Sequence, residues 1–482
     1  MPEVMVLPRS KKSENFSEWF EEVTLTTMVY DYRFPVKGCG VWPGYGFKLR
    51  KLVLDIMRRL LDESGHEECL FPMLIPKSLL EREAEHIKSF EGEVFWVTKG
   101  GFTELGEKLA LRPTSESIIM PMLSLWIKDH KDLPVKLYQI VSVFRYETKA
   151  THPMIRVREV TTFKEGHSAH ATYEDAENHV WNMVELYKKF FDELCIPYLI
   201  SKRPDWDKFA GALYSIAFDT IMPDGRALQI GTVHHLGQNF SKAFDVKYLK
   251  PDGSHEYVWT TSYGISERVI AALIAIHGDD RGLVIPPNVA PIQVVVIPIP
   301  YKGKELEVYS EAEKIHSELK SAGFRVAIDD RKEVTPGSKF YEWELKGVPI
   351  RVEIGPRDVE RGTATVVRRD NLSKEVIPRS ELVSSLRMLS EKLVRDLRDV
   401  AWNHLKERTL RTCKLEEAGE YIKARRGIVE VTWCGRSECG SALEESLEAK
   451  ILGSAIEYVK VEGKCVNCNG EAIKILRVAK SY

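Results

Sequence analysis

The chain has 482 residues, of which 44% are hydrophobic and 29% are charged, and its formal net charge is −2. This composition excludes a disordered chain, a collagen and a membrane-spanning protein, and the length predicts about three domains. Because the net charge is close to zero, any contact with nucleic acid has to be local rather than a general basic attraction.

Export and membrane insertion are not expected. The longest apolar runs, such as residues 269–276, are far shorter than the ~18 residues of a spanning helix. Residues 1–16 carry no apolar segment after a basic start, so they do not resemble a secretory signal. Four of the eight cysteines are scattered, which is typical of reduced thiols in a cytoplasmic protein: Cys39, Cys69, Cys195 and Cys413.

The first region, residues 1–285, has the pattern of an antiparallel sheet flanked by helices. Apolar spacing predicts a helix over residues 46–64 and another over residues 264–277. Short segments of alternating polarity lie between them, which favours an α+β fold over a doubly wound sheet. Strands are expected over residues 94–98, 135–147, 155–164, 213–221, 226–232 and 255–261.

A proline-rich joint at residues 285–291 opens a second region, residues 286–405, in which strands and helices alternate. This order predicts a small α/β domain with a mostly parallel sheet. Strands are expected over residues 292–299, 324–328 and 349–354, and helices over residues 304–322, 337–346 and 380–410.

The last region, residues 406–482, contains four clustered cysteines. The pairs Cys434-x4-Cys439 and Cys465-x2-Cys468 are separated by 25 residues. This spacing predicts a tetrahedral zinc site, and because no general base or water-open position is apparent, the zinc would be structural. Four unrelated thiols are the alternative.

Residues 135–170 are the most informative stretch, because two adjacent strands there present several arginines and a carboxylate. On a strand, Arg145 and Glu147 share one face, about 6.6 Å apart. Arg156 and Arg158 share a face of the next strand. Guanidinium groups are forked donors that suit phosphate and carboxylate. A solvated sheet face with cross-strand ion pairs has the same pattern, so spacing alone leaves both interpretations open.

Three segments resemble, in the correct order, the signature motifs of the class II aminoacyl-tRNA synthetases. Residues 44–76, a helix followed by a strand, are similar to motif 1, the dimer-forming element. The arginine-rich stretch is similar to motif 2, and residues 264–268 (GISER) are similar to motif 3. The resemblance implies a homodimer that activates an amino acid with ATP.

Longer strings are similar to prolyl-tRNA synthetases of the archaeal and eukaryotic type, over essentially the whole chain. They are residues 111–117 (LRPTSES), 164–172 (KEGHSAHAT), 228–245 and 277–287, together with the cysteine-rich tail. The resemblance implies that L-proline is joined to tRNA(Pro) through a prolyl-adenylate. It implies three domains: a class II catalytic domain (1–285), an anticodon-binding domain (286–405) and a small α+β zinc-binding domain (406–482).

The same resemblance assigns residues to ATP. Arg145 would hold the proline carboxylate and the α-phosphate, Arg156 would lie on the phosphate side, and Arg268 would meet the γ-phosphate. Arg145 and Arg268 are therefore the candidate catalytic residues, since fixed cations and positioning would supply most of the catalysis. Glu147 would contact the adenine end, and Gln229 is a further ATP-binding candidate. Glu147 and Gln229 are also candidates for the accompanying Mg²⁺.

A proline site needs a counter-charge for the secondary ammonium and a snug apolar slot for the ring. Thr114 and Glu116 match the family's residues for the ammonium. Plain core for Phe209, a structural role for His167 and a helix cap for Thr114 are open alternatives. The residues that match the family's pocket are Thr114, Glu116, Arg145, Phe163, Glu165, His167, Phe209, Gly231 and His234.

One position departs from the class pattern, which places an aromatic residue soon after the second arginine of motif 2 to stack on adenine. Val160 stands there, and the next aromatic residue is Phe163. Either a bulge shifts the register or Phe163 serves the amino-acid pocket. We favour the pocket, which leaves the adenine-stacking residue unassigned.

The resemblance also concerns tRNA and its proofreading. Arg158 and Arg268 are only 110 positions apart, so the editing insertion of bacterial-type relatives is absent. Because a methylene is worth only ~1–3 kcal/mol in such a pocket, we expect misactivation of cysteine and alanine, corrected by a separate protein if at all. Four residues that are also typical of a solvated surface are the candidate anticodon readers: Arg331, Lys339, Glu342 and Arg351.

Two alternatives stay open. A non-catalytic relative would have lost motif arginines or the tRNA-reading domain, yet Arg145, Arg268 and the whole middle region are present. A sister synthetase for threonine, glycine or histidine would need another pocket. A threonine site commonly uses a metal, and His234-His235 is the nearest approach to such a cluster in the first region.

Overall fold

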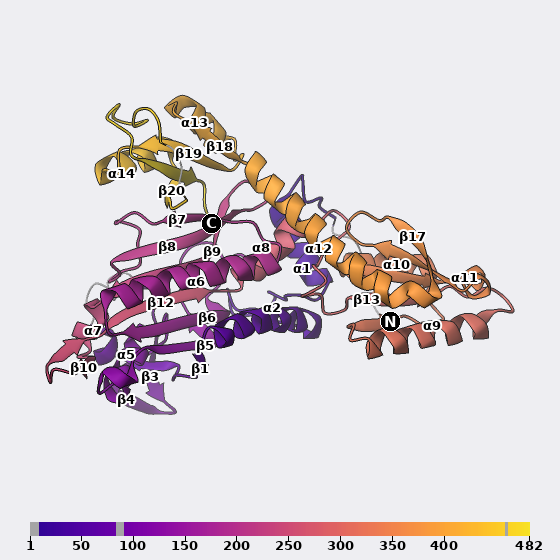
Figure 1. Ribbon diagram of the computed structural model, residues 1–482, viewed down its shortest axis with the longest axis horizontal. Coiled ribbons are helices and arrows are strands. Elements are labelled where there is room, and N and C mark those ends of the chain that lie inside the picture. The colour runs from indigo at the N-terminus through magenta and orange to yellow at the C-terminus, as the bar shows by residue number, and fades with distance from the viewer. Residues whose placement is uncertain (1–8, 83–90, 458–460) are drawn as a thin grey trace.

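The computed structural model describes residues 9–82, 91–457 and 461–482 (Figure 1). Its largest element is an eleven-stranded sheet that is antiparallel except at its two edge pairs, β1–β5 and β18–β19. The α+β architecture predicted for the first region is confirmed. In spatial order the strands are β1 (Glu67–Glu68), β5 (Val135–Phe144), β6 (Glu159–His170), β12 (Trp259–Ile265), β9 (Ala227–Gly237), β8 (Tyr214–Ile221), β7 (Leu199–Lys202), β20 (Lys450–Ala455), β21 (Lys474–Ala479), β19 (Ile428–Trp433) and β18 (Thr409–Thr412).

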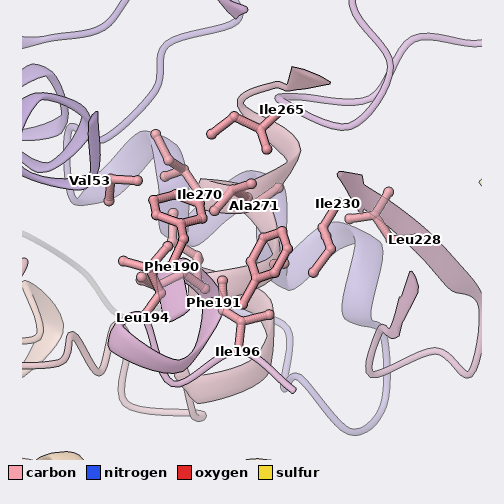
Figure 2. Close-up of a cluster of buried hydrophobic side chains, with 14 of the residues drawn as sticks. Val53, Phe190, Phe191, Leu194, Ile196, Leu228, Ile230, Ile265, Ile270 and Ala271 are labelled. Atoms are coloured by element: carbon pink, nitrogen blue, oxygen red, sulfur yellow. The ribbon is translucent and has the colours of Figure 1, made fainter. Parts of the chain in front are cut away.

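Three helices pack on one face of this sheet. Their apolar side chains form the main core, in which Phe190 and Phe191 cluster with Ile230 and Ile270 (Figure 2). The α6 helix was not anticipated, although Thr172 caps its N-terminus and its buried residues recur at helical spacing. The three helices are α2 (Gly44–Glu63), α6 (Tyr173–Glu193) and α8 (Arg268–His277).

Smaller elements surround the sheet in the first region. Strands β2, β3 and β4 form a separate three-stranded antiparallel sheet, and β10 and β11 form a hairpin-like pair. The bounds are α1 (Phe16–Thr26), β2 (Leu74–Pro76), α3 (Lys77–Leu80), η1 (Glu91–Glu93), β3 (Phe95–Gly100), β4 (Thr103–Leu111), α5 (Glu116–Trp126), η2 (His130–Asp132), α7 (Asn239–Ala243), β10 (Lys247–Leu249) and β11 (His255–Tyr257).

The connection between the strands of motif 2 is longer than the sequence predicted, although β6 continues to His170, beyond the predicted end at residue 164. Strand β5 ends at Phe144 and β6 begins at Glu159, so the arginines and Glu147 lie in the connection rather than on strand faces. Pro153 lacks an N–H for a ladder, and Met154 has a positive φ of 56°, which turns the chain there. The second predicted helix likewise begins only at Arg268, because the residues before it complete β12.

The middle region is an α/β domain with a five-stranded sheet of order β14-β13-β15-β16-β17. The first three strands are parallel, as predicted, but β16 and β17 add two antiparallel strands that the sequence did not indicate. The elements are β13 (Val294–Pro298), α9 (Glu305–Ser321), β14 (Val326–Ile328), α10 (Pro336–Leu345), β15 (Ile350–Ile354), α11 (Pro356–Arg361), β16 (Thr363–Arg368), β17 (Lys374–Pro378), η3 (Arg379–Glu381) and α12 (Leu382–Glu407).

The long helix α12 leads from the middle region to the last one, which lies beside the first region (Figure 1). Its strands continue the large sheet, because Ser454 and Ala455 of β20 pair with Lys202 and Ser201 of β7. Two helices, α13 (Leu415–Lys423) and α14 (Ser437–Leu447), complete this region. Within the described ranges, no helix is long and apolar enough to cross a membrane.

Candidate active site

A cavity of about 300 Å³ lies on the sheet face that points away from the three helices. Alternation along β6 defines the two faces: Phe163 and Glu165 line the cavity, whereas Lys164 between them donates a hydrogen bond to Tyr187 of α6. All residues predicted to bind ATP or proline line this cavity: Thr114, Glu116, Arg145, Glu147, Arg156, Phe163, Glu165, His167, Phe209, Gln229, Gly231, His234 and Arg268.

The floor of the cavity is a row of side chains across four strands. His167 of β6 pairs with Ser262 of β12, which pairs with His234 of β9, which pairs with Ser215 of β8. This register brings together residues that are far apart in sequence. A Cβ on Gly231 would lie 3.2 Å from the rings behind the sheet, so this residue meets the cavity only through its backbone.

One part of the cavity is cationic, because Arg145, Arg156 and Arg268 all face it. Burial, and then the charges of the other two arginines, lower the pKa of Arg268 to about 10. Glu147 offsets part of this charge through an ion pair of 3.8 Å with Arg156. Placing positive charges this close in a buried site costs free energy, which a bound polyanion would offset.

The motif 2 and motif 3 arginines also hold the backbone of the site. Arg145 donates from Nε to the carbonyl of Pro113 at 3.1 Å. Arg268 donates to the carbonyl of Ile155 at 2.8 Å, which joins motif 3 to the motif 2 connection. Arg158 does not line the cavity and instead lies over the ring of Tyr146 at 4.1 Å, so it does not share a face with Arg156 as predicted.

The neighbouring part of the cavity is anionic. Glu116 and Glu165 are both buried, and Glu116 accepts a hydrogen bond from the Thr114 hydroxyl. Burial alone would lower the pKa of His167, but Glu165, 3.5 Å away, and Glu116 outweigh it and raise that pKa. Burial alone would raise the pKa of Glu165, but His167 and its hydrogen-bond donors outweigh it and lower that pKa. A carboxylate that stays ionised here is a suitable partner for an ammonium group.

Aromatic rings form the walls of the cavity. Phe209 stacks on the imidazole of His234 with centroids 4.7 Å apart. His234 also bonds through Nδ1 to the Ser215 hydroxyl at 2.8 Å, and burial lowers its pKa to about 4, so it is neutral. The Phe163 ring lies 5.7 Å from the Arg145 guanidinium. Phe209 and His167 thus line the cavity as well as pack, which favours the functional interpretation over plain core.

A β-bulge lies at the position that departs from the class pattern. Val141 pairs with Phe163 but Val143 pairs with Val160, so the register shifts by one residue within β6. The bulge and the cavity position of Phe163 therefore occur together. Two residues that the sequence did not single out hold the bulge: Arg50 of α2 donates to the Thr162 hydroxyl at 2.6 Å, and Glu267 accepts from the Thr162 N–H at 3.0 Å.

Other residues of the site were also missed. Ser115 and Gln139 donate hydrogen bonds to the carboxylate of Glu165. Arg203 lines the cavity and donates to Gln229 at 2.9 Å. A polar residue at a buried strand position, such as Gln139, is a signal that could have been noticed. Nothing in the local sequence marks Arg203, whose partners come from distant strands.

The four clustered cysteines converge as predicted. Their sulfur atoms all lie within 4.8 Å of one another, with Cys434 and Cys468 3.8 Å apart. A tetrahedral zinc with Zn–S bonds of about 2.3 Å would separate its sulfur ligands by about 3.8 Å. The Gly470 N–H and then Arg436 lower the pKa of Cys468 to about 6, which favours the thiolate form. The donor set therefore fits a structural zinc ion.

The candidate anticodon readers form a paired network in the middle region. Arg331 forms ion pairs with Asp329 and Glu342 at 2.7 and 2.8 Å. Lys339 is 2% exposed and donates to the Asp329 carbonyl at 2.8 Å. Arg351, also buried, pairs with Glu344 and Glu353. Arg331 is the most accessible of the four, and the burial of Lys339 and Arg351 suits residues that position their neighbours.

Three family models match consecutive parts of the chain. The tRNA synthetase class II core domain (G, H, P, S and T) matches residues 95–277, and an anticodon binding domain matches residues 293–389. The C-terminal domain of prolyl-tRNA synthetase matches residues 415–482, which contain the cysteine cluster.

Relatives are similar over the full length. A proline–tRNA ligase of Ignicoccus hospitalis is 56% identical and covers 98% of this chain and 99% of its own. One from Metallosphaera sedula is 57% identical and covers 99% and 100%. The structure of Giardia lamblia prolyl-tRNA synthetase in complex with prolyl-adenylate superposes with a TM-score of 0.96 at 36% identity, over 99% of this chain and 100% of that one. The chain therefore belongs to the prolyl-tRNA synthetases, a family of class II aminoacyl-tRNA synthetases.

Proposed function

We propose that the protein joins L-proline to tRNA(Pro) with ATP, in the two steps of adenylate formation and transfer. The observation that carries this proposal is the division of one cavity into a cationic part and an anionic part. An amino acid has opposite charges on adjacent groups, so it fits across the boundary in one orientation. Its carboxylate would face Arg145 and its ammonium would face Thr114, Glu116 and Glu165.

The pocket walls favour proline among the amino acids. Phe163, Phe209 and His234 line the same cavity as the two glutamates, and their rings would supply the apolar surface for the proline ring. A secondary ammonium donates two hydrogen bonds, and the buried carboxylates of the anionic part supply acceptors. A metal site of the kind that threonine enzymes use is not supported. Among the described residues, the only group of side chains that could hold a metal ion is the cluster of four cysteines.

Adenylate formation follows from this placement. A carboxylate oxygen of proline attacks the α-phosphorus of ATP, and pyrophosphate leaves with the bonding electron pair. Arg145 and Arg156 would neutralise the charge where the two anions meet, and Arg268 would hold the γ-phosphate. Because the non-catalytic alternative requires loss of such arginines, the convergence of all three on one cavity argues against it.

Mg²⁺ bound with ATP supplies further neutralisation of phosphate charge. Glu147 lines the cavity, and its carboxylate suits a hard cation. Gln229 turns its amide oxygen to Arg203, so its N–H₂ group faces the cavity. An amide N–H₂ group is a hydrogen-bond donor and cannot serve as a ligand of a metal cation. Glu147 is therefore the better candidate of the two.

The second step requires tRNA, whose terminal adenosine hydroxyl would attack the prolyl carbonyl and release AMP. The middle region would read the anticodon, with Arg331 and Glu342 as the more accessible candidates. No inserted editing domain separates motifs 2 and 3, so a separate protein would have to clear mischarged tRNA. Because the reaction needs tRNA and ATP together, we place it in the cytoplasm.

ATP–pyrophosphate exchange with each of the twenty amino acids tests the first step. We expect exchange to be greatest with proline and weaker but measurable with cysteine and alanine. Smaller side chains also fit a proline pocket, and the contacts that they lose cost too little binding free energy for strong rejection. Exchange led by another amino acid would overturn the pocket assignment. If neither cysteine nor alanine gives exchange above background, the expected misactivation of these two amino acids is wrong.

We propose further that a second copy packs on the motif 1 face. Large apolar side chains are exposed on and around α2 and β2, including Val41, Phe47, Leu70 and Leu74. We expect a solution mass of twice 55.1 kDa by light scattering. A double F47E/L70E variant should shift the mass toward one chain, whereas L306E, on an exposed apolar residue of the middle region, should not. A monomeric wild type would refute the dimer.

A further inference from the structure

Arg203 lines the cavity and also contacts the last region, because its guanidinium joins three strands of the large sheet. It follows β7 directly and is only 8% exposed. One nitrogen, Nη1, donates to the Leu452 carbonyl of β20 at 2.6 Å. The other, Nη2, donates to Asp219 of β8 and to Gln229 of β9, each at 2.9 Å.

These contacts decide which way the Gln229 amide faces. A guanidinium has only donors, so Gln229 must turn its oxygen, Oε1, toward Arg203. The amide nitrogen is then directed away from Arg203, and among the described residues none accepts a hydrogen bond from it. Because Gln229 lines the cavity, its N–H₂ group is available to an acceptor there.

We propose that Arg203 is a positioning residue that fixes Gln229 as a hydrogen-bond donor to an oxygen of the bound nucleotide. The inference rests on the proposed function, since it takes ATP as the occupant of the cavity. Asp219 balances the charge of Arg203 through a buried ion pair, so the guanidinium need not turn toward a ligand. The Leu452 carbonyl holds the other end, which ties the geometry of the nucleotide site to the last region of the chain.

A second buried arginine at the same junction provides a matched control. Arg477 of β21 donates to the Ile200 carbonyl of β7 at 2.6 Å and pairs with Glu430 at 3.0 Å. It therefore links the same two regions as Arg203 does. It does not line the cavity, so it tests the structural link without the contact to Gln229.

The test is a double-mutant cycle in proline-dependent pyrophosphate exchange, with KM for ATP and kcat measured separately. R203M and Q229A should each raise KM for ATP about tenfold, as expected for one charge-assisted or polar hydrogen bond. The double variant should be no worse than Q229A, because Arg203 acts through Gln229. Q229E keeps an acceptor for Arg203 but loses the donor, and should behave like Q229A.

R477M should lower thermal stability as R203M does, yet leave KM for ATP within about twofold. Multiplicative effects of R203M and Q229A, or equal KM changes in R203M and R477M, would overturn the inference. A wild type that exchanges with no amino acid would instead refute the proposed function, so the two failures are distinguishable.

Discussion

Replacing Arg145 with alanine should reduce proline-dependent pyrophosphate exchange about a thousandfold. Arg145 lines the cavity, and in the proposed mechanism it would contact both reacting anions, the proline carboxylate and the α-phosphate. Its loss would then remove the positive charge that stabilises the transition state. The loss should appear in kcat more than in KM for proline, because the interaction strengthens as the anions approach. Steady-state exchange kinetics, with both substrates varied, give this separation.

Two further variants sharpen the prediction. R145K keeps the charge but not the forked donor, so it should recover only part of the activity. R59A removes an arginine of α2 whose partners are Glu63 and Glu193 and which lies outside the cavity, and it should exchange like wild type. An R145A protein that is folded by circular dichroism and exchanges within tenfold of wild type would remove Arg145 from the mechanism.

If the four cysteines hold a structural zinc ion, as their geometry predicts, replacing Cys465 with serine should abolish zinc binding and unfold part of the last region. Cys465 is fully buried in the core of that region, beside Cys439 and Trp433. Structural zinc contributes roughly 10 kcal/mol of binding free energy in small domains, so its loss should destabilise this region by several kcal/mol. Zinc content by mass spectrometry and amide exchange over residues 428–478 measure the two effects.

The exposed Cys413 supplies the control, because it lies outside the cluster. C413S should retain one zinc per chain and wild-type stability. Because β20 pairs with β7, loss of zinc should also reduce amide protection at Ser201 and Lys202. A C465S protein with a full zinc content, or a wild type purified without zinc, would contradict a zinc site at this cluster.

The sequence predicted the site far better than it predicted the sheet that carries it. The resemblance to a known family singled out thirteen residues that converge on one cavity, because short motifs can be recognised without knowledge of the sheet. The β5–β6 connection is longer than predicted, since alternation alone does not reveal that the ladder stops at Phe144 and resumes at Glu159. The helix α6 was overlooked although its capping residue Thr172 was visible.

Residues whose role depends on distant partners could not be predicted. Arg203 forms hydrogen bonds with residues of β8, β9 and β20, up to 249 positions away. No local sequence pattern predicts contacts between such distant segments. Arg50 binds the bulge at Thr162 only because α2 packs beside β6. The continuity of the sheet from β7 into β20 was likewise invisible, since the last region looked separate in sequence.

Charging of tRNA(Pro) is the measurement that tests the central claim most directly. The purified protein would be incubated with ATP, Mg²⁺, proline and a tRNA(Pro) transcript, and charged tRNA separated from uncharged tRNA on an acid gel. We predict that nearly all of the transcript becomes prolylated, and that a transcript with an altered anticodon is charged much more slowly. Exchange with proline in the absence of any charging would contradict the account, because the protein would then activate proline without being a ligase.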